Sequence, residues 1–376
     1  MSKLELLKSV GTRGELADLL NYPRSALAYA VYKVPAEQRY EEFRVAKKSG
    51  GERVIHAPCP ELKGLQKRLS NYLYDCHREI WPPLEFPRRS YSHGFQKDRG
   101  LSIFSNAWKH QNKRFVLNVD LKDYYPSFNF GRVRGYFLKN RSFELHEDVA
   151  TLIAQIVCHD NSLPQGAPTS PIVSELITSI LDQRLGRLSK KHHCTYSRYA
   201  DDITFSTNKA SFPEAIADFS TETDGAWKAE KELVNLVERS GFAINPNKTR
   251  MQLSASRQSA TGVVVNRKVN ISKKYYDAVR AMCNSLFKTG ACHYPATKEP
   301  ASLPVLKGKL EFVLAAKTYP KELESFSNLE AASKAPDGMP VPSHYNLYRR
   351  FLAYEKFHAN TRPLVICEGK TDNTYI

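Results

Sequence analysis

Hydrophobic and polar residues alternate along this chain with two periods, one helical and one extended. Helical spacing covers residues 1–32 and 61–81, and residues 40–58 between them form two short extended runs around KKSGG, which predicts a β-hairpin. The expected inward positions of the helical segments are Leu4, Leu6, Leu7, Leu19, Leu20, Leu62, Leu65, Leu69 and Leu73. The first part of the chain is therefore predicted to fold as one or two short helices, a hairpin and a further helix.

The middle of the chain is predicted to begin with a strand and to continue as a long helix. Residues 114–128 carry apolar residues at period two until Pro126 stops the strand. The loop LPQGAPTSP then leads into a helix, in which Ser170 is the expected N-cap and Pro171 suits the first helical position. The expected buried stripe consists of Ile172, Leu176, Ile180, Leu181, Leu185 and Leu188.

The second half predicts further strands followed by basic helices. The runs CTYSRY and ITFS flank Asp201 and Asp202 as the two strands of a hairpin. A helix is expected over 225–240, short extended segments follow, and from Ser272 onward the chain is helical and rich in Lys and Arg. Strands and helices in this order predict an α+β protein.

Length and charge narrow the class of protein. A chain of 376 residues is too long for one hydrophobic core, so two or three domains are expected. Lys and Arg number 55 against 39 Asp and Glu, a net charge of +16 that is spread along the chain. Basic side chains that neutralise phosphates release counterions, so this excess favours a nucleic-acid partner over simple solubility.

The sequence predicts no membrane partner and no disulfide framework. No stretch approaches the ~18 apolar residues of a membrane helix, and the N-terminus lacks a signal-peptide core, so a cytoplasmic location is expected. Seven scattered cysteines without a C-x-x-C pair fit reduced thiols. His192, His193 and Cys194 are of metal-ligating type, but no second ligand pair lies at zinc-finger spacing.

Three aspartates carry the strongest chemical signal. Asp120 ends an apolar strand, whereas Asp201 and Asp202 occupy the turn of the later hairpin. Adjacent side chains of a strand point to opposite faces, so Asp201 and Asp202 should not be equivalent metal ligands. One should be the main ligand and the other should support it, with Asp201 as the first choice. If the hairpin packs beside the Asp120 strand, the carboxylates converge. Two Mg²⁺ ions about 3.5–4 Å apart could then stabilise the attacking and leaving oxygens of phosphoryl transfer.

Five short motifs resemble those of bacterial retron reverse transcriptases. NVDLKDYYPSF, LPQGAPTSP and YADD resemble the palm motifs of reverse transcriptases, and the N-A-x-x-H in SNAWKH and the stretch ATGVVVN are typical of retron enzymes. Ala260 stands where the family usually has Val. The resemblance implies a right-hand polymerase with an antiparallel palm sheet and a helical thumb. It also implies RNA-templated DNA synthesis from dNTPs with two Mg²⁺ ions per active site.

The resemblance also implies a domain order. It places an N-terminal helical extension at 1–32, fingers at 33–114, a palm at 115–268 with fingers elements near 130–165, a thumb at 269–362, and the first strand of a truncated Toprim domain at 363–376. The Toprim resemblance rests on PLVICEGKTD, which also fits an ordinary terminal strand and turn. An effector acting through this tail would be a further partner, in keeping with phage-defence retrons.

Carried over position by position, the resemblance assigns roles to the active-site residues. Asp120, Asp201 and Asp202 become the metal-binding catalytic carboxylates, and Lys248 either protonates the leaving pyrophosphate or is a turn lysine. The implied nucleotide-binding residues are Lys47, Lys48, Arg53, Tyr125, Gln165 and Gly166. Each has an alternative: a solvated face for the cations, core packing for the tyrosine that would exclude a ribose 2′-OH, and loop spacing for the last two.

Retron enzymes imply a specific partner, a structured non-coding RNA that primes DNA synthesis from an internal guanosine 2′-OH and gives branched RNA–DNA (msDNA). The residues assigned to RNA are Asn106, His110, Thr261, Gly262, Lys273 and Lys274. Asn106 and His110 could instead form a buried hydrogen-bonded pair. Tyr275 or Tyr276 could stack on a base or pack in a core. The alternative functions are an intron-maturase-like reverse transcriptase and a non-catalytic RNA-binding scaffold.

Overall fold

The computed structural model describes residues 1–46, 50–82, 90–97, 100–220, 226–319 and 342–360. The chain divides into two compact units, Met1–Gly262 and Val263–Ile376, each with its own buried core. The predicted boundary between palm and thumb at residue 268 lies close to this division. The predicted extension and fingers fall within the first unit, and so does the predicted palm up to Gly262.

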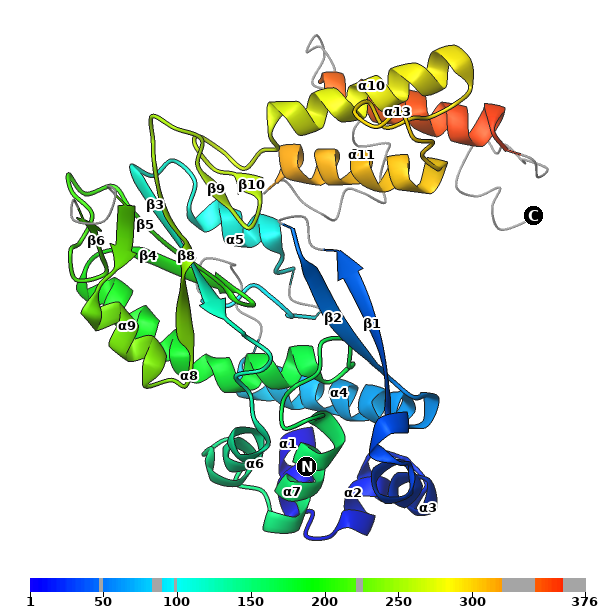
Figure 1. Cartoon of the computed structure of the whole chain (residues 1–376), viewed down its shortest axis with the longest axis vertical. Coiled ribbons are helices and arrows are strands. Elements are labelled where there is room, and N and C mark those ends of the chain that lie inside the picture. The colour runs from blue at the N-terminus through cyan, green and yellow to red at the C-terminus, as the bar shows by residue number, and fades with distance from the viewer. Residues whose placement is uncertain (47–49, 83–89, 98–99, 221–225, 320–341, 361–376) are drawn as a thin grey trace. The chain divides into compact units, whose positions relative to one another are not determined.

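A four-stranded antiparallel sheet is the centre of the first unit (Figure 1). Its strands are β3 Phe115–Lys122, β4 Thr195–Tyr199, β5 Asp202–Thr207 and β8 Ala243–Leu253, in the order β4-β5-β3-β8. The predicted strand at 114–128 and the predicted hairpin are thus confirmed, and the fold class is α+β. Val116 and Leu117 point to opposite faces of β3 and both are fully buried, so the strand is covered on both sides.

The two faces of this sheet differ chemically. One face carries Leu117, Val119 and Phe205, which belong to the main hydrophobic core together with residues of the long helix α8 Ser170–Lys191. The other face carries polar side chains such as Asn118 and Thr204, whose side chains are hydrogen-bonded at 3.3 Å. Helix α5 Ile103–Lys109 contacts β4. The apolar face anchors the sheet, and the polar face leads to the candidate site.

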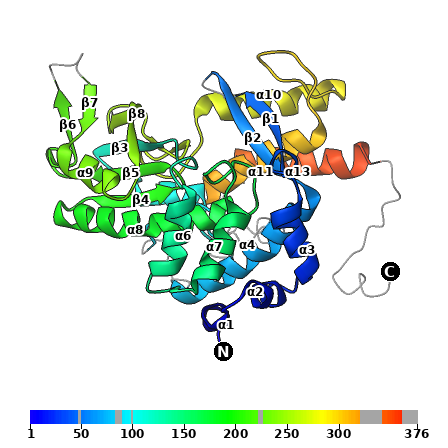
Figure 2. The same cartoon turned by 60° about the horizontal axis from the view of Figure 1, so that its bottom comes forward.

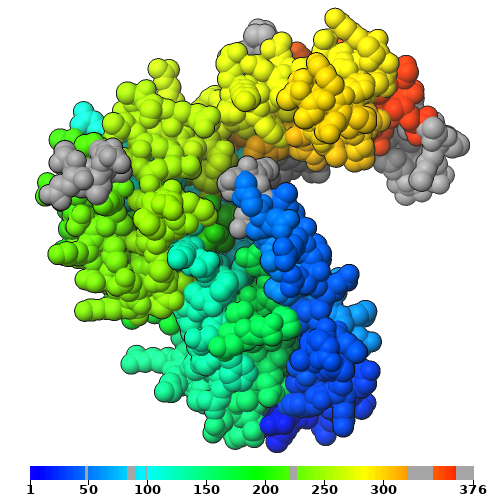
Figure 3. All heavy atoms as spheres, in the orientation of Figure 1, coloured from blue at the N-terminus to red at the C-terminus, as the bar shows by residue number. Residues whose placement is uncertain are grey.

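Short and long helices complete the first unit. They are α1 Lys3–Ser9, α2 Arg13–Leu19, α3 Arg24–Ala28 with the turns Tyr29–Lys33 and Ala36–Gln38, α4 Pro60–Ile80, α6 Phe130–Lys139, α7 Glu147–Val157 and α9 Lys231–Glu238. Helix α4 contacts α1, α7 and α8, and α2 contacts α7. Figures 2 and 3 show the blue N-terminal helices beside the cyan and green residues of these segments. Capping boxes begin both α1 and α2.

The remaining strands of the first unit lie outside the central sheet. Strands β1 Tyr40–Ala46 and β2 Glu52–Pro58 pair antiparallel, as the sequence predicted around KKSGG. The other short strands are β6 Ala217–Ser220, β7 Ala226–Ala229 and β9 Ser259–Ala260. Part of the helix expected over 225–240 is therefore strand β7, and only α9 is helical.

The second unit is a small helical bundle that begins with the short strand β10 Val263–Val264. Its helices are α10 Lys273–Thr289, α11 Leu303–Thr318 and α13 Ser343–Ala353, which contact one another in pairs, and the turn Tyr354–His358 follows. Ser272 caps α10, and Gly290 ends it in the left-handed conformation at φ 73°. Within the described ranges, the structure has no helix that is long and apolar enough to cross a membrane.

Three local predictions were wrong. Thr169, not Ser170, is the N-cap of α8, because the Ser170 hydroxyl donates to the carbonyl of Pro164 at 2.7 Å. Ile180 lies outside the buried stripe with 38% of its surface exposed, whereas the other five predicted positions are buried. The N-terminal residues form three helices instead of one or two, with Leu16 and Ala17 in the core beside the predicted Leu7 and Leu20.

Candidate active site

The backbone brings Asp120, Asp201 and Asp202 to one end of the sheet. Asp120 and Asp202 are directly opposed in the β3–β5 register, so their side chains share a face. Asp201 is the second residue of the two-residue loop between β4 and β5. The first residue, Ala200, has a left-handed φ of 55°. The N–H of Leu121 donates to the Asp201 carbonyl at 3.0 Å and ties this loop to β3. The expected packing of the hairpin beside Asp120 is confirmed.

Lys248, on β8, completes the charged group. Its Nζ lies 2.9 Å from both carboxylate oxygens of Asp120, and this hydrogen bond raises the pKa of the lysine. Asp120 is buried, while Lys248 is largely exposed. Desolvation and the neighbouring carboxylates Asp201 and Asp120 raise the pKa of Asp202 to about 6, although its side chain keeps contact with solvent. Desolvation is also the main cause of the raised pKa of Asp201.

The donor set fits a hard cation. Carboxylate oxygens are the ligands that Mg²⁺ prefers, and a cation would offset both the desolvation and the mutual repulsion that raise the pKa values of Asp201 and Asp202. Among the described residues, no three His, Cys, Asp or Glu side chains are already arranged as a metal site. Asp120 is engaged with Lys248, so its carboxylate has to leave the ammonium, at least in part, to share an ion with its neighbours.

Tyr125 and Arg53 lie close enough to this group to interact with it electrostatically. Burial raises the pKa of Tyr125, and the nearby charge of Asp201 raises it further, whereas Arg53 lowers it. Arg53 also lowers the pKa of Asp201. Arg53, on strand β2, is exposed, and it acts on the carboxylates through its charge. Lys47 and Lys48 lie outside the described residues.

The loop that carries Gln165 and Gly166 packs against strand β2. The N–H of His56 donates to the Gln165 carbonyl at 2.8 Å. Gly166 has φ 122°, and a Cβ at this position would lie 2.8 Å from the His56 carbonyl oxygen and 2.9 Å from a methyl group of Ile55. Only glycine allows both this conformation and this approach. The loop thus sets the position of the β1–β2 hairpin.

Asn106 and His110, assigned to RNA by the resemblance, are fully buried. His110 contacts the hydroxyls of Ser206 at 2.7 Å and Ser197 at 2.6 Å, and Ser197 donates to Asn106 Oδ1 at 2.6 Å. Because Ser197 gives its proton to Asn106, His110 donates to Ser197 through Nε2 and accepts from Ser206 through Nδ1. Burial lowers the pKa of His110 well below its usual value, which keeps the ring neutral. Neither side chain is accessible to RNA, so the predicted RNA contact is wrong for these two residues and the buried hydrogen-bonded alternative holds.

The other residues assigned to RNA are partly or fully exposed. Thr261 donates through its hydroxyl to the Ile103 carbonyl at 3.1 Å, and Gly262 has φ 79° with open space around it. In the second unit, Lys273 is almost fully exposed and pairs with Asp277 at 2.9 Å, and Lys274 is exposed. Tyr276 contacts Lys317 through its ring, at 4.5 Å from the ring centroid.

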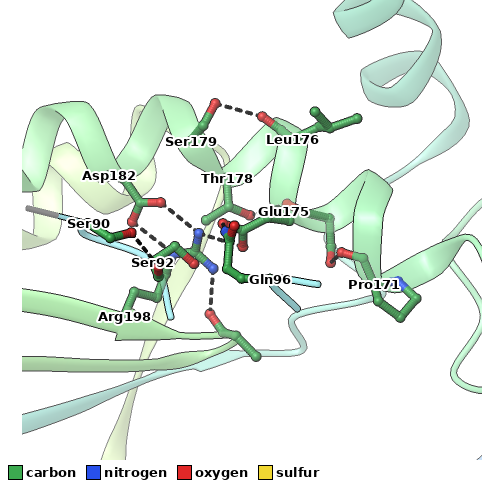
Figure 4. Close-up of polar contacts among 12 residues, drawn as sticks. Ser90, Ser92, Gln96, Pro171, Glu175, Leu176, Thr178, Ser179, Asp182 and Arg198 are labelled. Atoms are coloured by element: carbon green, nitrogen blue, oxygen red, sulfur yellow. Dashed lines mark hydrogen bonds and ion pairs between the residues drawn. The ribbon is translucent and has the colours of Figure 1, made fainter. Parts of the chain in front are cut away.

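A buried ionic cluster behind the hairpin was not predicted. Arg198, fully buried, reaches Asp182 and Glu175 of α8 (Figure 4). A cavity of about 260 Å³ adjoins the two carboxylates, away from the three aspartates. The sequence contained one signal: Arg198 is an ionisable residue in a short strand at a position that faces the core, where an unpaired charge is costly.

The antiparallel sheet with three aspartates at one end and a glycine loop against the β1–β2 hairpin is the arrangement of a polymerase palm. The family description "Reverse transcriptase (RNA-dependent DNA polymerase)" matches residues 45–276. Retron Mx65 reverse transcriptase of Myxococcus xanthus is 33% identical over 271 residues, or 68% of this chain and 58% of the relative. Retron Ec86 reverse transcriptase of Escherichia coli is 30% identical over 300 residues, or 78% and 82%. This chain belongs to the retron reverse transcriptases.

The chain spans 58% and 52% of the length of two Myxococcus xanthus relatives, those of retrons Mx65 and Mx162. Among solved structures, a telomerase from Candida albicans in complex with a fragment of telomeric RNA is similar over 87% of this chain and 66% of the telomerase chain. The two share 12% sequence identity, with a TM-score of 0.44. The predicted Toprim strand at 363–376 lies outside the described residues, and the comparisons do not support it or an effector.

Proposed function

We propose that this chain is an RNA-directed DNA polymerase that copies part of a cognate structured RNA into DNA and starts from a 2′-OH of that RNA. The observation that carries the proposal is the convergence of Asp120, Asp201 and Asp202 at the open end of a palm sheet, with Lys248 beside them. Mg²⁺ held by these carboxylates would supply Lewis-acid stabilisation of the attacking and leaving oxygens. A non-catalytic scaffold has no need of three clustered carboxylates that repel one another.

The surrounding residues take roles in nucleotide binding. Arg53 is suited to a triphosphate because its guanidinium binds phosphate oxygens in pairs. Tyr125, whose pKa is raised in part by the charge of Asp201, takes the role of excluding the 2′-OH of a ribonucleotide. Lys248 has a raised pKa and stays protonated at neutral pH, so it can give a proton to the departing pyrophosphate. Gln165 and Gly166 border the nucleotide through the loop that positions β2.

The domain names follow from the same proposal. The β1–β2 hairpin and its helices act as fingers, the sheet as palm, and the helical second unit as thumb. The exposed Lys273 and Lys274 at the start of α10 are available to phosphates of the RNA or of its DNA copy. Retron membership favours priming from the partner RNA and a branched product, and the msDNA would be this product.

The chemical linkage in the product tests the proposal. When the full-length protein is expressed with its neighbouring RNA locus, the purified complex should contain DNA joined to RNA through a 2′,5′ branch. A debranching nuclease should release the DNA from the RNA, while ribonuclease that cuts 3′,5′ bonds should leave a short branched remnant. DNA with an ordinary 5′ end and no branch would refute the priming part and leave a generic reverse transcriptase.

Metal binding should depend on pH through Asp202. Its raised pKa means that the metal-free protein retains a proton there up to a pH of about 6. We therefore expect Mg²⁺ affinity, measured by calorimetry, to fall as pH drops from about 7 to about 5, with proton release on binding near the lower end. Without metal, the same shift lowers the free energy of unfolding as pH rises through about 6, because the fold disfavours the ionised form.

The variant Asp202→Asn separates these effects from general acid sensitivity. It removes the proton that competes with the metal, so its weaker Mg²⁺ binding should vary little over this pH range. An affinity that is constant with pH in the unmodified protein would contradict the coupling between Asp202 and the metal.

A further inference from the structure

The loop that carries Asp201 is held from two sides. Its own carbonyl accepts from the N–H of Leu121 at 3.0 Å, and the preceding carbonyl, that of Ala200, accepts from Arg198 Nη1 at 3.1 Å. These two carbonyls flank the Cα of Asp201. Once both are fixed, the direction in which the Asp201 side chain leaves the backbone is fixed as well. Leu121 belongs to β3, so the second contact, from Arg198, is the one supplied from behind the hairpin.

Arg198 can hold this carbonyl because its guanidinium is itself anchored. Nε and Nη2 donate to the two oxygens of Asp182 at 2.8 and 2.6 Å, and Nη2 also donates to Glu175 at 2.9 Å (Figure 4). Both carboxylates lie on α8, in the main core. Each carboxylate also has a second partner: Tyr196 donates to Asp182 at 2.7 Å and Gln96 to Glu175 at 2.6 Å. The guanidinium is thus clamped to a long buried helix.

The backbone of Arg198, on strand β4, is also held in place by residues 91–94. The N–H of Arg198 donates to the Tyr91 carbonyl at 2.8 Å, and its carbonyl accepts from the N–H of His93 at 2.9 Å. Gly94 then lies against the loop, where a Cβ would be only 2.6 Å from the backbone nitrogen of Ala200. Backbone and side chain of Arg198 therefore both serve the position of this loop.

We propose that Arg198 is a positioning residue for metal binding and nucleotidyl transfer, which acts by holding the Ala200 carbonyl and so aims the Asp201 carboxylate at the metal. This rests on the proposed function. Lysine cannot replace it, because three donors on one nitrogen cannot reach Asp182, Glu175 and Ala200 at once. A misplacement of about 1 Å at a reacting centre can cost about a hundredfold in rate. The arginine therefore matters for catalysis without contacting the substrate.

The test compares Arg198→Lys with Arg132→Lys in the full chain. Arg132 is partly buried and serves as the control because, like Arg198, it donates to backbone carbonyls, those of Ser127, Ser240 and Gly241. Mn²⁺ binding is followed by electron paramagnetic resonance of the free ion, and primer extension is measured against Mg²⁺ concentration. For Arg198→Lys we expect about tenfold weaker metal binding and a lower kcat, with the KM for primer-template little changed. For Arg132→Lys we expect wild-type metal binding even if its melting temperature falls.

Gly94→Ala provides a second variant that leaves the ionic cluster intact. Its methyl group pushes on the Ala200 nitrogen, so metal binding should weaken here too. Wild-type metal binding in a folded Arg198→Lys protein would overturn the proposal, and so would wild-type binding in Gly94→Ala if Arg198→Lys does not fold. The metal readout does not need activity. Weak metal binding in the variants with no extension by any protein would refute the polymerase proposal and leave the positioning role standing.

Discussion

Asp201→Asn is expected to abolish Mg²⁺-dependent DNA synthesis while RNA binding is largely kept. The substitution preserves the shape of the side chain and removes the charge that a hard cation needs. Loss of a group that merely orients a metal ligand already costs about 10–100-fold, so loss of a ligand should lower the extension rate by more than about a hundredfold. Asp120→Asn should have a similar effect and should also free Lys248, whose ammonium is bonded to Asp120.

The matched control is Asp123→Asn. Asp123 lies in the same motif three positions after Asp120, is exposed, and has a left-handed φ of 47° that asparagine accepts readily. Extension of a labelled primer on an RNA template and binding of the cognate RNA should both stay near wild type in this variant. Wild-type extension by Asp201→Asn would remove Asp201 from the metal site. Unchanged RNA binding without synthesis even in the unmodified protein would support the scaffold alternative.

Sequence patterns predicted the elements whose signal is local. The β1–β2 hairpin, helix α4 and the β4–β5 hairpin follow from period and turn residues, and the predicted inward leucines of α4 are buried. The three aspartates could be identified because the end of a strand and the turn of a hairpin each leave a pattern in the local sequence. Their convergence needed the β3–β5 register, which is a contact between segments far apart in the chain.

Other features could not be predicted because they depend on which face of an element is buried. The N-A-x-x-H residues form polar contacts under α5 because β4 and β5 place serines on the face that α5 covers. Arg198 stands in the same short strand as Ser197, and the alternation of strand side chains sends it to the opposite face, toward α8. A motif shows that such residues belong together, whereas only the register shows whether they meet a ligand or one another.

Gly166→Ala is expected to weaken nucleotide binding more than it weakens the fold. An alanine at φ 122° is strained by about 1–3 kcal/mol, and its Cβ would meet the His56 carbonyl oxygen at 2.8 Å. Relief of this contact moves strand β2 away from the loop and breaks the hydrogen bond from His56 to Gln165. Arg53, three residues earlier on β2, would move away from Asp201 with it.

The measurement that isolates this effect is the KM for dNTP in primer extension. We expect it to rise about tenfold, equivalent to about 1.4 kcal/mol of binding, with a smaller change in kcat. Gly100→Ala is the matched control, because it has a positive φ of 63° but nothing within 4 Å of its Cβ position. It should lose stability through backbone strain alone and keep the wild-type KM. Equal KM values in the two variants would show that the contact of the glycine loop with β2 does not govern nucleotide binding, and that Arg53 acts independently of it.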